Sequence, residues 1–525
     1  EVRHAMNSEN GEEFSDLDNE RSEFLDTHDT PQRKSSRIQN SSSKSNKSVD
    51  KSMQSRESVL RTSTAGGGDL QNTAVEVSNA KNLIAWQFVL MLLTSILVTA
   101  LLTNYLATFR LRDKSSINAV LELPKYTNAE LISSHLKTLT SSEHIAGTAS
   151  GRQHAELVAS LWNQSEALDS IQIVEYTCLV SLPKSASLRI VDEANPNADD
   201  GHLQLQEGAV DGDPTSLLES QLSAGGIPFH GYAASGEVSG SLVYANYGRN
   251  EDFEALKVNA KVDVQGKIVL MRYGKIFRGL KVYNAQKNGA VGAIIYSDPA
   301  DDGFSKGKEY PNGPWRNPTG VQRGSVARSS VCAGDPTTPN GASVSGAHRE
   351  SIESLRESSC LPKIPSIPIS WKNAKELLAL LDASAGSVKP PSADFVGGLK
   401  ASPHNIQYKV GPLEEKHKIE LKVDSEISLK PTFSVIGKLF GRREPHKAVW
   451  LGNHHDAWVF GSADAASGTV VLMQFLYALG KLRNARGGWR PRRSMIFSAW
   501  DGEEFNMLGS TEHAEDHAQE ISSSV

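Results

Sequence analysis

The chain has 525 residues, with 55 Lys and Arg against 61 Asp and Glu and a formal net charge of -6. This length favours about three domains, and the mild acidity gives no support to a nucleic-acid partner. Its cysteines are too few for a disulfide framework or a cysteine-based zinc site. Cys178, Cys332 and Cys360 fit either one bridge in an oxidising lumen or unpaired buried thiols.

The first part of the chain predicts a disordered tail and a membrane anchor. Residues 1–80 are rich in Ser, Asn and charged residues and nearly free of aromatic residues, so they cannot bury enough apolar surface to fold. An uncharged segment follows from Leu83 to Leu106, and about 20 apolar residues suffice to cross a bilayer. We therefore expect a transmembrane helix at 83–106, followed by a stalk at 107–125.

The orientation of this anchor rests on three signals. The basic residues after it, Arg110, Arg112 and Lys114, favour a cytosolic body. The tail before it and the large folded region after it favour a type II protein, and a glycosylation sequon at Asn163 supports a lumenal or extracellular body. We adopt the type II arrangement in a vacuolar, endomembrane or plasma membrane.

The body begins with a predicted helix and strand, and the predicted secondary structure then changes. Leu157, Leu161 and Trp162 have helical spacing, and residues 171–182 are strand-like. Residues 181–424 consist of short strands separated by Gly, Pro and Asn, which predicts a β-rich domain with few helices.

The last hundred residues alternate strands with helices. The expected order is a strand at 447–454, a helix at 467–482, a strand at 493–500 and a helix at 503–521. This alternation indicates a parallel or mixed α/β sheet.

Polar residues gather where these last two strands end. His454 and Asp456 follow the first strand, Asp464 precedes the next helix, and Glu503 and Glu504 follow the second strand. Open α/β sheets bind ligands at the carboxyl ends of their strands. Imidazole and carboxylate groups bind zinc and leave a position for water, from which a further carboxylate can remove a proton. A hydrogen-bonded turn, a helix cap and a solvated helix start are the ordinary alternatives.

Several long segments resemble the M28 zinc peptidases of the glutamate carboxypeptidase II and transferrin receptor group. GNHHDAWVFGSADAASG at 452–468 and residues 489–515 resemble the second peptidase segment, residues 143–162 the first, and residues 248–301 the protease-associated (PA) domain. The resemblance covers roughly residues 120–525, with fungal vacuolar-sorting-type members nearest. It implies a zinc-exopeptidase α/β domain, in segments 126–180 and 425–525, interrupted by a PA domain at 181–424.

The resemblance also implies roles for single residues. Members hold two zinc ions, and His454, Asp464 and Glu504 match three of the ligands. Glu503 matches the general base, and Asp456 matches the acid that orients the histidine ligand. His455 is expected to be a bystander.

Two further ligands of the family, an Asp and a second His, match nothing before Val525. His513 and His517 lie on the last predicted helix and are expected to be surface residues. We therefore expect this chain to bind metal poorly and to be inactive as a fragment, and the full-length protein to be a homodimer through the family's helical dimerisation domain.

Two secondary sites follow from the same resemblance. Arg249 matches an arginine that holds the substrate's terminal carboxylate in glutamate-releasing relatives, and a structural ion pair is the alternative. Thr338, Glu512 and Glu515 match a calcium site, although Gly341 stands where relatives have a Tyr.

The sequence thus predicts a membrane-anchored dizinc exopeptidase that acts on peptides. The alternative is a non-catalytic receptor or sorting adaptor with the same fold.

Overall fold

The computed structural model describes residues 91, 93–103, 118–195, 201–208, 226–303, 307–401, 403–414, 416–485 and 488–524. The body from Asn118 onward belongs to one compact unit, and the described helical residues 91 and 93–103 belong to a second. The tail predicted at 1–80 and most of the predicted stalk lie outside the described residues.

The expected membrane anchor is described only in part. Residue 91 and residues 93–103 are helical. Their large apolar side chains are exposed, namely those of Met91, Leu93, Ile96, Leu97, Val98, Leu101 and Leu102. Among the residues that the structure describes, no helix combines the length and the apolarity needed to cross a membrane.

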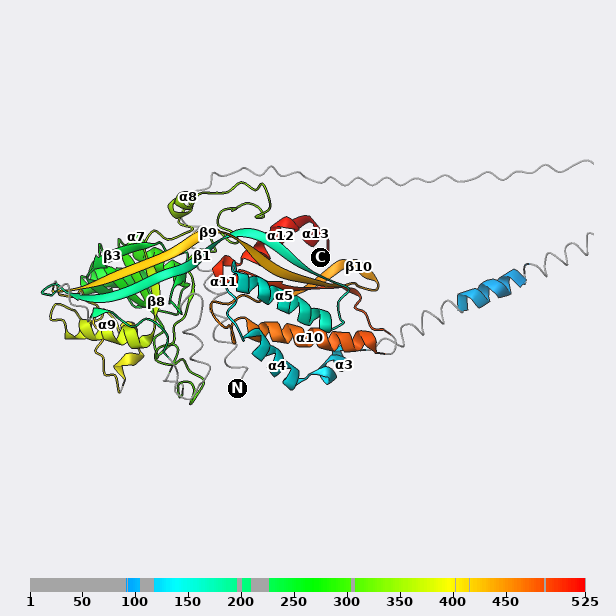
Figure 1. Ribbon diagram of the computed structural model, residues 1–525, viewed down its shortest axis with the longest axis horizontal. Coiled ribbons are helices and arrows are strands. Elements are labelled where there is room, and N and C mark those ends of the chain that lie inside the picture. Colours follow the sequence, from blue (N-terminus) through cyan, green and yellow to red (C-terminus); the bar gives the residue numbers. More distant parts are fainter. Residues whose placement is uncertain are drawn as a thin grey trace, which may run out of the picture. The chain divides into compact units, whose positions relative to one another are not determined.

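A mixed sheet forms the centre of the peptidase part (Figure 1). Its strand order is β1-β9-β11-β10, and β3 also pairs with β9. β10 and β11 are parallel, whereas β9 is antiparallel to both β1 and β11, so the mixed sheet predicted from the sequence is confirmed. The bounds are β1 (Ser170–Asp192), β3 (Gly236–Gly240), β9 (His417–Leu439), β10 (Glu444–His454) and β11 (Arg493–Trp500).

Helices cover both faces of this sheet (Figure 1). One face carries α4 (Ala129–Leu139), α5 (Ala149–Gln164) and α10 (Ala466–Asn484), and the other α12 (Leu508–Asp516) and α13 (Ala518–Ser524). Successive residues of a strand point to opposite faces. Phe433 and Val435 accordingly enter the core with α5 and α10, while the Ser434 hydroxyl accepts the Asp501 N–H on the α12 side. The chain enters this layer through α3 (Ala119–Glu122) and η1 (Leu123–Tyr126).

The region between β1 and β9 has its own four-stranded parallel sheet, in the order β4-β5-β6-β8. Its strands are β4 (Leu242–Tyr244), β5 (Ile268–Arg272), β6 (Gly292–Tyr296) and β8 (Ser366–Ile369). Unlike the expected β-rich domain with few helices, this region alternates strands with helices, because parallel strands need crossover connections. The helices are α6 (Asn250–Ala255), the π-helical turn η4 (Leu256–Ala260), α7 (Arg278–Lys287), α8 (Ile352–Glu357), α9 (Trp371–Ala383), η6 (Ala393–Phe395) and η7 (Gly398–Lys400).

β1 and β9 run through both parts of the body (Figure 1). They pair from Ser170 with Lys438 to Asp192 with His417, with a register shift between Pro183 and Ser185. One end packs in the core with α5, and the other contributes Leu188 and Leu421 to the core of the parallel sheet. The domain boundaries expected at 180/181 and 424/425 therefore fall inside continuous hydrogen-bonded strands.

Two local features bear on the site. A two-stranded ribbon, β2 (His230–Gly231) with β7 (Gly324–Ser325), lies between the two sheets. The helix predicted at 503–521 is broken after α11 (Glu503–Asn506), because Met507 has a left-handed backbone with φ of 59°.

The cysteines resolve as one bridge and one thiol. Cys332 and Cys360 form a disulfide, and Cys178 is free and buried. Of the two alternatives drawn from the sequence, the single bridge is therefore the one found.

Candidate metal centre

The predicted site residues converge at the carboxyl edge of β10 and β11. These parallel strands are neighbours, and His454, the last residue of β10, is in register with Trp500, the last of β11. The loop after β10 carries Asp456 and Asp464, and the turn after β11 leads directly into α11 with Glu503 and Glu504. The shared edge thus brings together residues separated by about fifty positions.

His454 lies among three carboxylates. Its Nε2 is 2.8 Å from Asp464 Oδ1, and its Nδ1 is 3.4 Å from Asp456 Oδ1 and 3.9 Å from Glu503 Oε2. Burial disfavours the charged imidazole, but hydrogen bonds to Asp456 and Asp464 and the charges of Asp456 and Glu503 outweigh it and raise the pKa of His454 to about 12. The hydrogen bond from His454 in turn lowers the pKa of Asp464.

Asp456 contacts both His454 and the start of α11. Its side chain is buried, and its two oxygens accept the backbone N–H groups of Glu503 at 3.1 Å and Glu504 at 3.2 Å. One carboxylate therefore contacts the His454 ring and fixes the start of α11. These contacts are of the kind that an orienting residue makes, and the orienting role of Asp456 stays a prediction.

The two glutamates differ in environment. The Glu503 side chain is 40% exposed, which leaves it accessible to a substrate. Burial raises the pKa of Glu504 well above its usual range, and the nearby charges of Asp464, Glu503 and Asp456 raise it further. A carboxylate in such surroundings is stabilised by a cation.

The donor types suit zinc, but their present arrangement is that of an ion pair. Across the described ranges, no group of three or more His, Cys, Asp or Glu side chains is placed to hold a metal ion. Two donors on one tetrahedral zinc, each at about 2.0–2.1 Å, lie roughly 3.3 Å apart. His454 and Asp464 are closer than this because they contact each other directly.

His455, which was expected to be a bystander, is buried and belongs to a stack of imidazoles that sequence reasoning missed. All three rings, of His144, His154 and His455, are buried. His144 and His154 have ring centroids 3.9 Å apart, and His154 Nδ1 lies 3.1 Å from His455 Nδ1. Burial lowers the pKa of His144 to about 4 and of His154 to about 2. Histidines on α5 and its preceding turn thereby support the loop that carries His454, a contact that no local pattern predicts.

Arg249 is engaged in a cluster of carboxylates. Its guanidinium donates to Asp252 at 2.9 Å and to Asp394 at 2.5 Å, and it lies 3.2 Å from Glu251. Its backbone N–H also donates to the Asp252 carboxylate at the start of α6. The described contacts are those of the structural alternative.

The three residues expected at a calcium site are not gathered into an oxygen cage. Glu512 is buried and accepts the backbone N–H groups of Asp335 and Ser343, whereas Glu515 is exposed. The Thr338 hydroxyl contacts the Ser343 hydroxyl at 2.8 Å. The positive charge next to these acids comes from Arg349, whose Nη1 donates to Asp335 Oδ2 at 2.7 Å.

The prediction of a surface position for His513 was wrong. Its ring is buried, stacks on His517 at 4.2 Å, and packs against Trp450 and Trp500. The break at Met507 turns α12 back onto the sheet, which a continuous helix would not do. His517 is partly exposed.

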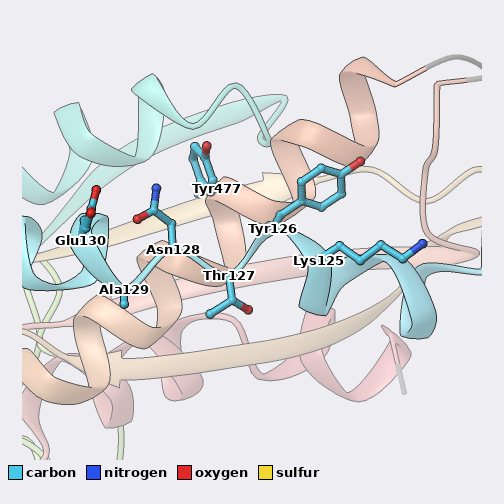
Figure 2. Close-up of a pocket in the computed structure, with 7 residues that line it drawn as sticks. All are labelled: Lys125, Tyr126, Thr127, Asn128, Ala129, Glu130 and Tyr477. Carbon is cyan, nitrogen blue, oxygen red and sulfur yellow. The ribbon is translucent and has the colours of Figure 1, made fainter.

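Figure 2 shows the residues that line a surface cavity of about 430 Å³. It is lined by residues of η1, the start of α4 and Tyr477 of α10, namely Lys125, Tyr126, Thr127, Asn128, Ala129, Glu130 and Tyr477. None of the residues of the candidate metal centre contributes to it.

Comparison with known proteins agrees with this architecture. Residues 238–328 match the PA domain, and residues 434–525 match peptidase family M28. The chain is 37% identical over 401 residues to a glutamate carboxypeptidase 2 homolog of Caenorhabditis briggsae, covering 74% of this chain and 49% of the relative.

Two further relatives are similar at the same level. The probable glutamate carboxypeptidase LAMP1 of Arabidopsis thaliana is 38% identical, over 81% of this chain and 57% of its own length. Aminopeptidase NAALADL1 of Rattus norvegicus is 34% identical, over 75% of this chain and 51% of its own length. The chain spans about half the length of these curated relatives. It carries a PA domain and an M28 peptidase region, and it is similar to relatives named glutamate carboxypeptidases and to an aminopeptidase.

Proposed function

We propose that the protein is a membrane-anchored, zinc-dependent exopeptidase that hydrolyses a peptide bond near a chain end. The observation that carries this proposal is the convergence of His454, Asp464, Glu503 and Glu504 at one sheet edge, with Asp456 bound to both the His454 ring and the start of α11.

Each of these residues has a defined task. His454, Asp464 and Glu504 would hold zinc. A second zinc ion would take its remaining ligands from the family's further Asp and second His, which match no residue before Val525. When bound, zinc supplies a polarised scissile carbonyl and a water of lowered pKa. Glu503 accepts the proton of the attacking water and passes it to the departing amine, and its exposure gives it access to both. Asp456 keeps the His454 ring in the orientation for binding.

Release of amino acids from peptides blocked at either end tests this function and shows which end is trimmed. Zinc content is measured on the same samples. Glu503→Ala is expected to lower kcat by about 10²–10⁴-fold while zinc remains bound. Glu175→Gln, at an exposed position on β1, is the matched control and should keep full activity. Undiminished turnover in Glu503→Ala removes Glu503 from its role.

The second candidate is a non-catalytic receptor or sorting adaptor. It is favoured by the direct contact of His454 with Asp464, whose 2.8 Å separation is shorter than that of two donors on one tetrahedral zinc ion. A full-length protein that neither binds zinc nor releases amino acids would support it.

We also propose that residues 83–106 anchor the protein and that the body lies in a lumen or outside the cell. The Cys332–Cys360 disulfide supports an oxidising compartment, and Asn163 is exposed at the last turn of α5, where a glycan can be attached. Enzymatic deglycosylation should increase the mobility of the wild-type protein on a gel and leave Asn163→Gln unchanged. A wild-type protein without glycan at Asn163 would remove this support.

A further inference from the structure

Helix α11 is too short to hold its own position. It has four residues, Glu503–Asn506, and is flanked by Gly502 and Met507, both with left-handed backbones. A single helical turn is unstable alone, because few hydrogen bonds compensate for the ordering of its backbone. The placement of Glu503 and Glu504 therefore depends on contacts at the two ends of this turn.

Asp456 holds the first end through the N–H groups of both glutamates. The second end is held by the side chain of Asn506. Its Nδ2 donates to Gly334 O at 2.8 Å and also to Cys332 O, and its Oδ1 accepts from the Ser329 hydroxyl at 2.9 Å. Both N–H groups and the carbonyl of this buried amide are thus used.

The backbone of Asn506 adds a further contact to the same segment. Its carbonyl accepts the N–H of Gly334 at 3.0 Å, so residue 334 is bonded to Asn506 in both directions. A side chain could not be accommodated there, because a Cβ on Gly334 would lie 2.7 Å from Glu512 Oε1 and φ is +76°. The segment is therefore fitted closely against α11 and α12.

The segment 329–334 is itself fixed from outside the peptidase region. Cys332 forms a disulfide with Cys360. Arg328 and Ser329 follow β7, and the ribbon of β2 and β7 contacts the loop after β10. Gly231 of that ribbon lies against Trp458, because a Cβ on Gly231 would be 3.1 Å from the indole. In the sequence, Trp458 stands between His454 and Asp464. Asn506 thus joins the end of the glutamate helix to a disulfide-closed segment of the inserted region.

We propose that Asn506 is a positioning residue for Glu503 and Glu504, which sets α11 against segment 329–334 so that both carboxylates face His454. The proposal rests on the proposed peptidase function. Loss of the Asn506 amide frees the second end of α11, while Asp456 still holds the first. Residues that orient metal ligands typically change metal affinity or activity by about 10- to 100-fold.

The test compares Asn506→Ala with a matched variant, Asn373→Ala. Asn373 is 3% exposed and Asn506 is 4% exposed. Asn373 donates to Gln204 O at 3.0 Å and accepts from the Ser370 hydroxyl at 2.8 Å, but it lies on α9, far along the chain from α11. Both variants remove a buried side-chain amide of the same kind, so both should lower the temperature of unfolding.

Only Asn506→Ala should weaken zinc affinity, measured by competition with a chelator, and lower kcat, each by about 10- to 100-fold and with little change in KM. Ser329→Ala removes one hydrogen bond of the set and should give a smaller change in the same direction. If Asn506→Ala does not fold, the zinc affinity and kcat of Ser329→Ala test the positioning role instead.

Zinc affinity and kcat equal to wild type in Asn506→Ala, or in Ser329→Ala where that variant decides, overturn the positioning role. A change of equal size in Asn373→Ala also overturns it, because the effect would then be general destabilisation. If the wild-type protein binds no zinc and releases no amino acid, the proposed function fails and this role fails with it. An active wild type with an unaltered Asn506→Ala removes the positioning role alone.

Discussion

His454 Nε2 and Asp464 Oδ1 lie 2.8 Å apart, with Asp456 against the other nitrogen of the same imidazole. The ring is therefore held between two carboxylates, and its pKa rises to about 12. Because this pKa lies above the usual 6.5, the contact contributes stability to the metal-free protein fully below pH 6.5 and loses it as the pH rises towards 12.

Zinc binding should release a proton from His454. Metal ligands must be deprotonated, and His454 carries its proton at neutral pH in the metal-free protein. Calorimetric titration with zinc at pH 7, in buffers of different ionisation enthalpy, measures the number of protons released. We expect about one more proton for the wild type than for His454→Ala. Equal release from the two proteins would show that His454 is not a zinc ligand.

Asp456→Ala should weaken zinc binding by about 10- to 100-fold, since it removes both the partner of His454 and the acceptor of two N–H groups of α11. Asp298→Ala is the matched control. Asp298 is equally buried and accepts the N–H groups of Ala300 and Gly398, but in the inserted region. Both variants should unfold at lower temperature, and only Asp456→Ala should alter zinc affinity. The same affinity in both variants would contradict the orienting role.

Arg249→Met should reduce the free energy of unfolding by about 1–3 kcal/mol, because Asp252 is left buried without its ion pair. KM for a peptide substrate should stay close to that of the wild type. Chemical denaturation and steady-state kinetics measure the two quantities. A raised KM with unchanged stability would instead support binding of a substrate carboxylate by Arg249.

Calcium should neither bind near Glu512 nor raise the temperature of unfolding, because Arg349 already supplies the positive charge next to Asp335. Arg349→Met should lower the free energy of unfolding by about 3 kcal/mol, the usual cost of leaving one buried ion-pair partner alone. Thermal unfolding with and without added calcium checks both statements. Stabilisation of the wild type by calcium would restore the calcium site implied by the family resemblance.

The elements nearest to the chemistry could be predicted because their signals are local. The strand ending at His454, the helix starting near Ser467 and the strand ending at Trp500 agree with β10, α10 and β11 within a few residues. The strand at His454 was expected to be buried, whereas β10 has no buried residue because it ends the strand order of its sheet. Parallel pairing of the two strands then places His454 beside Glu503, as expected from the rule for strand ends.

What the sequence did not reveal depends on contacts between distant segments. The break of the last helix depends on a left-handed Met507, a residue with no special preference for that conformation. The stack of His154 on His455 joins α5 to a loop some three hundred positions later. The use of Asn506 depends on backbone carbonyls of Cys332 and Gly334, which have no sequence signature.

The β1–β9 pairing has a consequence for how the protein is synthesised. β1 leaves the ribosome long before β9, with the whole parallel-sheet region made in between. During that interval β1 is a long strand without its main partner, the kind of exposed edge that favours aggregation. The mixed sheet cannot be completed until His417–Leu439 has been made, and the core around the parallel sheet also waits for Leu421 and Val423 of the same strand.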